Sequence, residues 1–128
     1  MQRLLLEAAW EKTIAKGDLA IIEQVFHSTK EDQKQAITFN TIRYAFNHKD
    51  QLLYTNLIHN FSETGVDLSK VDLVIFQEQE MIAGHSFQEN RLHIPPKTSM
   101  PWTFIFPKGS YQSDKVSNTM KMEIKKAD

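Results

Sequence analysis

The sequence lacks cysteine, has only four glycines and four prolines, and contains no long hydrophobic run. Without cysteine the chain forms no disulfide, no thiolate-bound iron–sulfur cluster and no cysteine-ligated zinc site. The glycines are scattered along the chain, which argues against a glycine-rich phosphate-binding loop. No segment approaches the ~20 apolar residues that a membrane-spanning helix needs. We therefore expect no membrane span.

An excess of one charge is also lacking. Fifteen basic and sixteen acidic residues give a formal net charge of -1. Nucleic-acid-binding domains usually show a clear basic excess, so we expect no nucleic acid among the partners. The length of 128 residues, 41% of them hydrophobic, is enough to build one buried core.

The N-terminal sequence MQRLLLEAAW bears on the compartment. Glu7 interrupts the apolar run after three leucines. A secretory signal needs about 7–15 uninterrupted apolar residues followed by a small-residue cleavage site. We therefore expect a cytoplasmic protein.

Residues 1 to about 30 show helical spacing, with a break around Gly17. One apolar stripe contains Leu4, Leu5, Ala8, Ile22 and Phe26. This stripe either covers one end of the rest of the chain, or binds a partner or a second copy, as amphipathic helices do. A polar linker follows, which predicts a helical segment with linker over 1–33 and a second domain over 34–128.

Beyond residue 35 the hydrophobic period changes from about 3.6 to 2, the period of a β-strand. The phase shifts between Phe39 and Ile42, which predicts a β-bulge. Hairpin-length connections join the strands, and no helical pattern separates them. The expected fold is mainly β: an immunoglobulin-like antiparallel β-sandwich of six to seven strands, preceded by a short N-terminal helical segment.

The run LHIPPKTSMPWTFIFP, from Leu92 to Pro107, is the most informative part of the chain. Its three aromatic residues recur at a period of two and so share one face of a strand. That face is either core or an exposed patch that recruits a partner, and the polar or aliphatic residues between them favour core. The predicted core residues are Trp102, Phe104, Phe106, Leu57 and Phe87.

Reactive chemistry is hard to find in this sequence. The five histidines, His27, His48, His59, His85 and His93, form no metal-binding motif. There is no GxSxG nucleophile elbow, and a spatial Ser-His-Asp triad would need a pocket that holds a serine beside His59 or His85. We assign no catalytic, cofactor-binding or metal-binding residue. A small-ligand or metal-binding protein that uses the histidines is the alternative, and a small hydrolase is a more remote one.

Three segments resemble a known family: TNLIHNFSE (residues 55–63), VDLVIFQEQEMIAGHSF (71–87) and IPPKTSMPWTFIFP (94–107). They are similar to the SLAP domain, named for the S-layer assembly proteins of Gram-positive bacteria. Gln79 stands where a glycine is commoner in that family. The resemblance implies an association with an accessory Sec route that exports S-layer proteins together with a second secretion ATPase.

From this resemblance and the absence of reactive motifs we predict a non-enzymatic protein-interaction module, an accessory factor in secretion or cell-envelope (S-layer) assembly. The implied partner is a protein, either a secretion ATPase or an exported envelope protein, and a homodimer is left open. No cofactor is expected.

Overall fold

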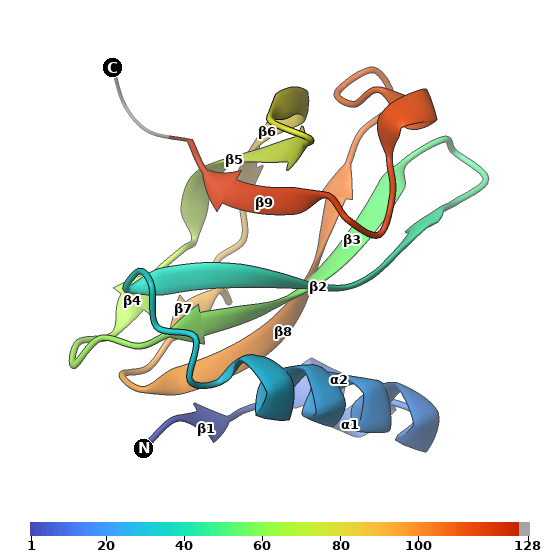
Figure 1. The fold of residues 1–128 in the computed structure, drawn as a ribbon. Helices are drawn as coiled ribbons and strands as arrows, with labels where there is room; N and C mark the ends of the chain where they lie inside the picture. The colour runs from blue at the N-terminus through green and yellow to red at the C-terminus, as the bar shows by residue number, and fades with distance from the viewer. Residues whose placement is uncertain (126–128) are drawn as a thin grey trace.

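The fold is mainly β, as a computed structural model that describes residues 1–125 shows (Figure 1). The six longer strands and two helices carry the architecture, and three two-residue strands and one 3-10 turn complete it. In chain order the elements are β1 (Arg3–Leu4), α1 (Ala8–Thr13), α2 (Lys16–Thr29), β2 (Ile37–Phe46), β3 (Leu52–Asn60), β4 (Val66–Asp67), β5 (Lys70–Gln77), β6 (Glu80–Gln88), β7 (His93–Ile94), β8 (Thr98–Phe106), η1 (Ser113–Lys115) and β9 (Lys121–Ile124).

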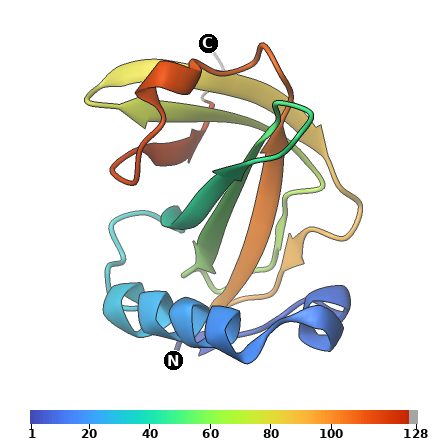
Figure 2. The same ribbon diagram turned by 90° about the vertical axis from the view of Figure 1, so that its right-hand side faces the viewer.

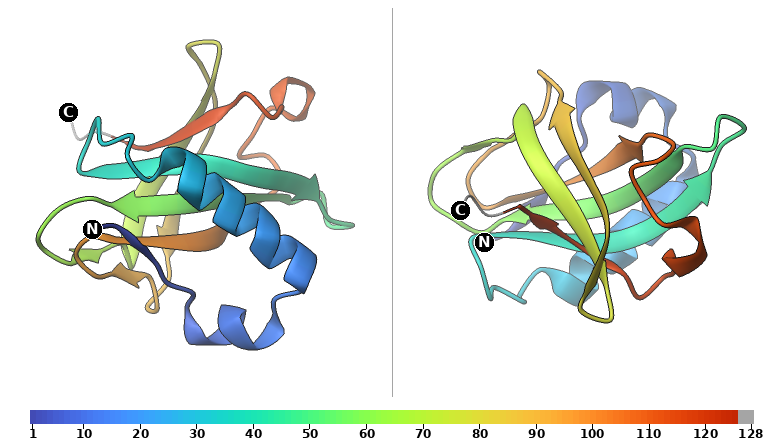
Figure 3. Two further views of the ribbon diagram at one scale, coloured as in Figure 1. Left: turned by 60° about the horizontal axis from the view of Figure 1, so that its bottom comes forward. Right: turned by 90° about the horizontal axis from the view of Figure 1, so that it is seen from above.

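The elements form three layers. One sheet has the strand order β1-β8-β3-β2, a second has the order β6-β5-β9, and β4 pairs with β7. Figure 2 shows the four-stranded sheet in the middle, with the helices on one face and the three-stranded sheet on the other. Seen from above, β5 and β6 run across β3 and β8 instead of along them (right view of Figure 3).

The main core lies between the two sheets. In β8, Phe106 and Phe104 lie opposite Leu52 and Tyr54 of β3, and all four side chains are buried. Trp102 follows on the same face and is also buried. The partly buried Phe87 of β6 makes edge-to-face contacts with Phe104 and Phe106, at centroid distances of 5.3 Å and 5.0 Å. Leu57 is fully buried too, but on the helix side of β3.

The predicted bulge is confirmed. The register of β2 with β3 shifts between Thr41 and Arg43, so that Ile42 is an extra residue in β2. Before the bulge, Thr41 faces the space between the sheets, where its hydroxyl bonds to that of Tyr54. Ile42 packs instead with the helix-side cluster. The bulge therefore delivers an apolar side chain to the face that the helices cover.

The N-terminal prediction was partly wrong. Leu4 lies in β1, which pairs in parallel with β8, and α1 begins only at Ala8. The sheet is thus not purely antiparallel, and η1 adds a helical turn late in the chain. A run of leucines fits a strand as well as a helix, and pairing with a strand about 95 residues away leaves no local signal. The immunoglobulin-like type of the sandwich stays a prediction.

Asn60 joins two loops that are far apart in sequence. Its buried side-chain amide donates toward the carbonyl oxygens of Thr64, Ile94 and Pro95, at 2.9–3.1 Å. Its Oδ1 accepts from the backbone N–H of Ser62 at 3.0 Å. Asparagine has the donors and the acceptor that such a junction needs in one short side chain. The loop after β3 is thereby fixed to the proline turn before β8.

The hairpin between β5 and β6 turns through two residues with positive φ, Glu78 at 51° and Gln79 at 70°. Two consecutive positive values are typical of a type I′ turn, in which glycine is preferred at the second position. Gln79 therefore adopts a conformation that a side chain with a Cβ disfavours.

Trp102→Ala should lower the free energy of unfolding by about 3–5 kcal/mol, because it leaves a cavity between the sheets. Urea denaturation measures this directly. Ile105→Ala is the matched control in the same strand, because Ile105 is 47% exposed and its truncation should have a small effect. Equal stability of the two variants would contradict the assignment of Trp102 to the core.

Gln79→Gly should raise the free energy of unfolding by about 0.5–1 kcal/mol, because glycine relieves the positive φ. The control is Gln88→Gly in β6, where φ is not positive and glycine should destabilise by a similar amount. Thermal melts of the two variants should therefore shift in opposite directions. A downward shift for both would show that the turn is not strained.

Candidate functional site

The two N-terminal helices pack against the outer face of the four-stranded sheet. Ile22 and Phe26 lie one turn apart on α2, and both pack on Leu57 of β3. Ile22 is only 2% exposed. The spacing of four residues brings the two side chains to the same face of the helix, which explains why α2 lies across β3 and β2 (left view of Figure 3).

The short helix α1 is held through Trp10, which is partly buried while the other five residues of the helix are exposed. The indole of Trp10 stacks on that of Trp102, with ring centroids 6.3 Å apart. On Trp102 the guanidinium of Arg91 lies 5.3 Å from the ring centroid, and an Arg91 nitrogen lies 3.6 Å from the carboxylate of Glu7. Glu7 caps α1 by accepting from the N–H of Ala9. Aromatic stacking and charge together fix this helix at the sheet edge.

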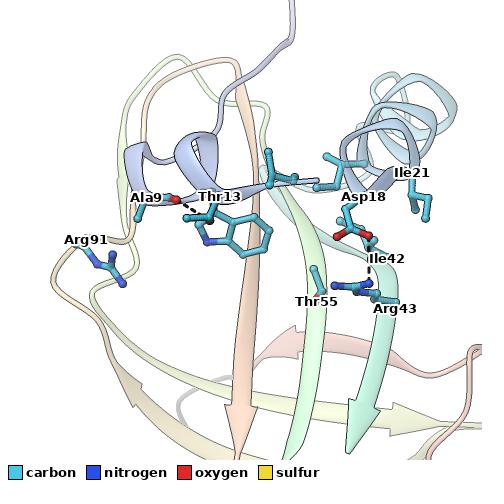
Figure 4. A pocket seen from close by; sticks show the side chains of 11 residues that line it. Ala9, Thr13, Asp18, Ile21, Ile42, Arg43, Thr55 and Arg91 are labelled. Carbon is cyan, nitrogen blue, oxygen red and sulfur yellow. Dashed lines mark hydrogen bonds and ion pairs between the residues drawn. The ribbon is translucent and has the colours of Figure 1, made fainter. Parts of the chain in front are cut away.

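A pocket of about 400 Å³ opens between the helices and the sheet. We call it the helix–sheet pocket. In Figure 4, Asp18 and Arg43 meet on one side of it and Arg91 lies on the other. Its lining residues are mostly apolar: Ala9, Trp10, Thr13, Ile14, Asp18, Ile21, Ile22, Ile42, Arg43, Thr55 and Arg91. The pocket exists because α1 and α2 diverge, which leaves Thr55 of β3 as part of its floor.

The charges at the rim are solvent-exposed. Arg43 bonds to Asp18 at 3.3 Å, and the arginine side chain is 62% exposed. Arg91 is 55% exposed and bonds to Glu89 at 3.1 Å. Exposed ion pairs of this kind contribute about 0–1 kcal/mol, so either guanidinium can exchange its partner for a carboxylate of a bound molecule. The site can therefore bind an apolar group flanked by an anion.

The apolar surface continues past the helices along the same sheet face. Ala45, Leu53 and Ile105 lie directly opposite one another on β2, β3 and β8. Each lies two residues away from Arg43, Thr55 or Thr103 in the same strand, on the side away from the helices. Ile21, on the pocket side of α2, is 44% exposed. The pocket is thus continuous with a wider apolar face.

His59 and Ser99 come within hydrogen-bonding distance of each other. The Nδ1 of His59 and the Oγ of Ser99 are 2.5 Å apart, and the Nε2 of His59 bonds to Thr29 at 2.7 Å. Both His59 and Ser99 are 0% exposed, so a substrate cannot reach the hydroxyl. Burial lowers the pKa of His59 from 6.5 to about 4, although the charge of Asp32 acts in the opposite direction. This pair joins α2 to the sheet and does not form an accessible nucleophile.

The other histidines are dispersed. His27 and His48 are exposed, His85 is half-buried beside Phe87, and His93 pairs with Asp67 at 3.4 Å. Within residues 1–125, no three histidine or carboxylate side chains gather into a possible metal site. None of the five histidines lines the helix–sheet pocket.

The residues predicted to bind a partner occupy different environments. Leu5 and Ala8 are exposed, Leu4 is half-buried, and Ile22 and Phe26 are buried against the chain's own sheet. Only Ile22 contributes to the pocket. Their role in partner binding stays a prediction. Sequence reasoning did not single out Trp10, Ile21, Arg43 and Arg91, because these residues come from distant segments and share no local pattern.

The fold and the site define a mainly β domain with an open apolar face beside its N-terminal helices. The chain belongs to the SLAP domain family, whose family model matches residues 4–125. Neither a curated protein nor a solved structure was found to match it. No helix within the described part of the chain is long and apolar enough to cross a membrane.

Lowering the pH from 7 to 4 should destabilise the protein through His59. The unfolded histidine, with a pKa near 6.5, binds protons that the folded one, with a pKa near 4, rejects, so stability falls as the pH drops through this window. The loss from this group should reach about 3 kcal/mol. Urea denaturation at several pH values measures it.

The comparison variant for this experiment is His59→Gln, which should show a shallower dependence on pH. His27→Gln, at an exposed position on α2, should retain the wild-type slope. Identical slopes for the wild type and His59→Gln would show that His59 is not held neutral in the folded protein.

Proposed function

We propose that this chain is a non-enzymatic protein-interaction module that acts as an accessory factor in secretion or in cell-envelope (S-layer) assembly. The observation that carries the proposal is the helix–sheet pocket, an open apolar hollow whose rim bears Arg43 and Arg91. A partner would insert an apolar side chain between the helices and place a carboxylate near one of the two arginines.

The wider surface supports a polypeptide over a small molecule as the ligand. Small-molecule sites usually enclose most of their ligand. Here the pocket opens onto the row of exposed Ala45, half-buried Leu53 and exposed Ile105, which extends the apolar surface along the sheet. Protein interfaces combine such an apolar centre with a polar, charged rim.

Membership of the SLAP domain family supports an envelope-associated role. The candidate partners are a secretion ATPase of the accessory Sec route and an exported envelope protein. Cytoplasmic localisation and a homodimeric state stay predictions.

Crosslinking in cells tests this function. A photoreactive amino acid at position 21, on the exposed rim of the pocket, should crosslink to one protein that mass spectrometry identifies as part of the export machinery or as an exported envelope protein. The same probe at Gln24, which is exposed on α2 but does not line the pocket, should not capture it.

The captured partner should then bind the purified chain, and Ile21→Asp should weaken this binding at least tenfold, because the introduced carboxylate would place a charge at the apolar rim. Gln24→Asp adds the same charge on α2 outside the lining and should have little effect. A partner bound equally by both variants would show that the pocket is not the interface.

A further inference from the structure

The edges of the two sheets meet without pairing. β2 is an edge strand of the four-stranded sheet and β9 is an edge strand of the three-stranded sheet. They are neighbours in space, as Figure 1 shows for the teal and red strands. Within residues 1–125 no backbone hydrogen bond joins them, and Thr41 instead bonds through its hydroxyl to the carbonyl oxygen of Met120 at 3.1 Å. We call residues 34–41 and 118–125 the β2–β9 seam.

The pairing of each strand with its own sheet fixes which backbone groups face the seam. The carbonyl oxygen of Ala36 accepts from the backbone N–H of Phe61, so the even-numbered residues at the start of β2 direct their backbone N–H and C=O groups toward β3. The backbone N–H and C=O groups of Ile37 and Phe39 therefore point away from β3. Directly after β9 the backbone N–H of Lys125 donates to the carbonyl oxygen of Asp72, at the end of the ladder between β5 and β9. The backbone groups of Met122 and Ile124 therefore point away from β5. Both strands therefore direct unpaired donors and acceptors toward the seam.

Two grooves follow the seam, with volumes of about 470 and 460 Å³. The second has apolar walls, with Ile37 and Phe39 on one side and Met122 and Ile124 on the other. Ile124 is 37% exposed. Unpaired edges beside an apolar groove have the properties that proteins use to bind an extended segment as an additional strand.

The charges along the seam indicate which extended segment would bind there, namely an acidic one. Lys34, Lys121 and Lys125 line the grooves and are exposed. None of the three forms an ion pair within the described residues. Asp32 and Glu123 are the acidic residues of the lining. An extended segment that carries carboxylates would find three unpaired ammonium groups along its path.

We propose that the β2–β9 seam binds an extended acidic polypeptide segment of a partner, which adds as a strand to the edge of β2. Its backbone pairs with Ile37 and Phe39. Alternate side chains enter the apolar groove, and the carboxylates between them contact Lys34, Lys121 and Lys125. This site shares no lining residue with the helix–sheet pocket and does not depend on the function proposed for that pocket.

Fluorescence anisotropy with a labelled seven-residue peptide of alternating glutamate and valine tests the proposal. The purified full chain should bind it, and a peptide of alternating lysine and valine should bind at least tenfold more weakly. Lys121→Glu should weaken binding of the acidic peptide at least tenfold. Lys49→Glu, an equal charge change in the exposed turn after β2, should leave it within twofold.

A second pair of variants tests the backbone contact. Ile37→Pro removes the outward N–H at the first residue of β2, a position where proline is tolerated. Ile37→Ala shortens the side chain but keeps the N–H. Proline should weaken binding at least tenfold more than alanine does. Should Ile37→Pro fail to fold, as judged by its thermal melt, the lysine variants still decide the proposal.

Several outcomes would overturn this proposal: no binding of the acidic peptide, equal binding of the basic peptide, or equal effects of Lys121→Glu and Lys49→Glu. Analytical ultracentrifugation gives the last such outcome. If the wild type sediments as a dimer and Lys121→Glu or Ile37→Pro sediments as a monomer, a second copy of the chain occupies the seam instead. Ile21→Asp should leave peptide binding unchanged, so failure of the seam and failure of the pocket can be told apart.

Discussion

The structure depends on strand β3 being enclosed on both faces. Every residue from Tyr54 to Phe61 is buried. One face packs into the sandwich through Tyr54 and Ile58, and the other packs under α2 through Leu57 and His59. Because burial of apolar surface is the main source of stability, we expect the packing of α2 on β3 to stabilise both elements; the division into a helical segment over 1–33 and a second domain over 34–128 stays a prediction. The helix–sheet pocket and the seam are two places where this layered packing is incomplete.

The period of the hydrophobic residues predicted much of the strand arrangement. The alternation in residues 102–106 identified a strand whose aromatic face lies in the core. The phase shift after Phe39 located the bulge, since an inserted residue changes which face the next side chains occupy. These features are local, so a short window of sequence is enough to predict them.

The features that depend on contacts between distant parts of the sequence could not be predicted. The strand at Arg3–Leu4 forms only because β8 offers a free edge there. The pocket combines residues from α1, α2, β2, β3 and the loop that holds Arg91, and no sequence window contains them together. The same holds for the seam, whose two strands, β2 at Ile37–Phe46 and β9 at Lys121–Ile124, lie far apart in the sequence. His59 and Ser99 belong to no motif in the sequence, and only folding makes them a buried pair.

Native-state hydrogen exchange of the backbone amides tests the three-layer account most directly. Amides of α2 between Leu19 and Thr29 should exchange nearly as slowly as those of β3, because the helix separates from the sheet only when the strand beneath it is exposed. Exchange of α2 within seconds, while β3 remains protected for hours, would contradict it. The helices would then be detached for much of the time, and the helix–sheet pocket would not belong to the folded state.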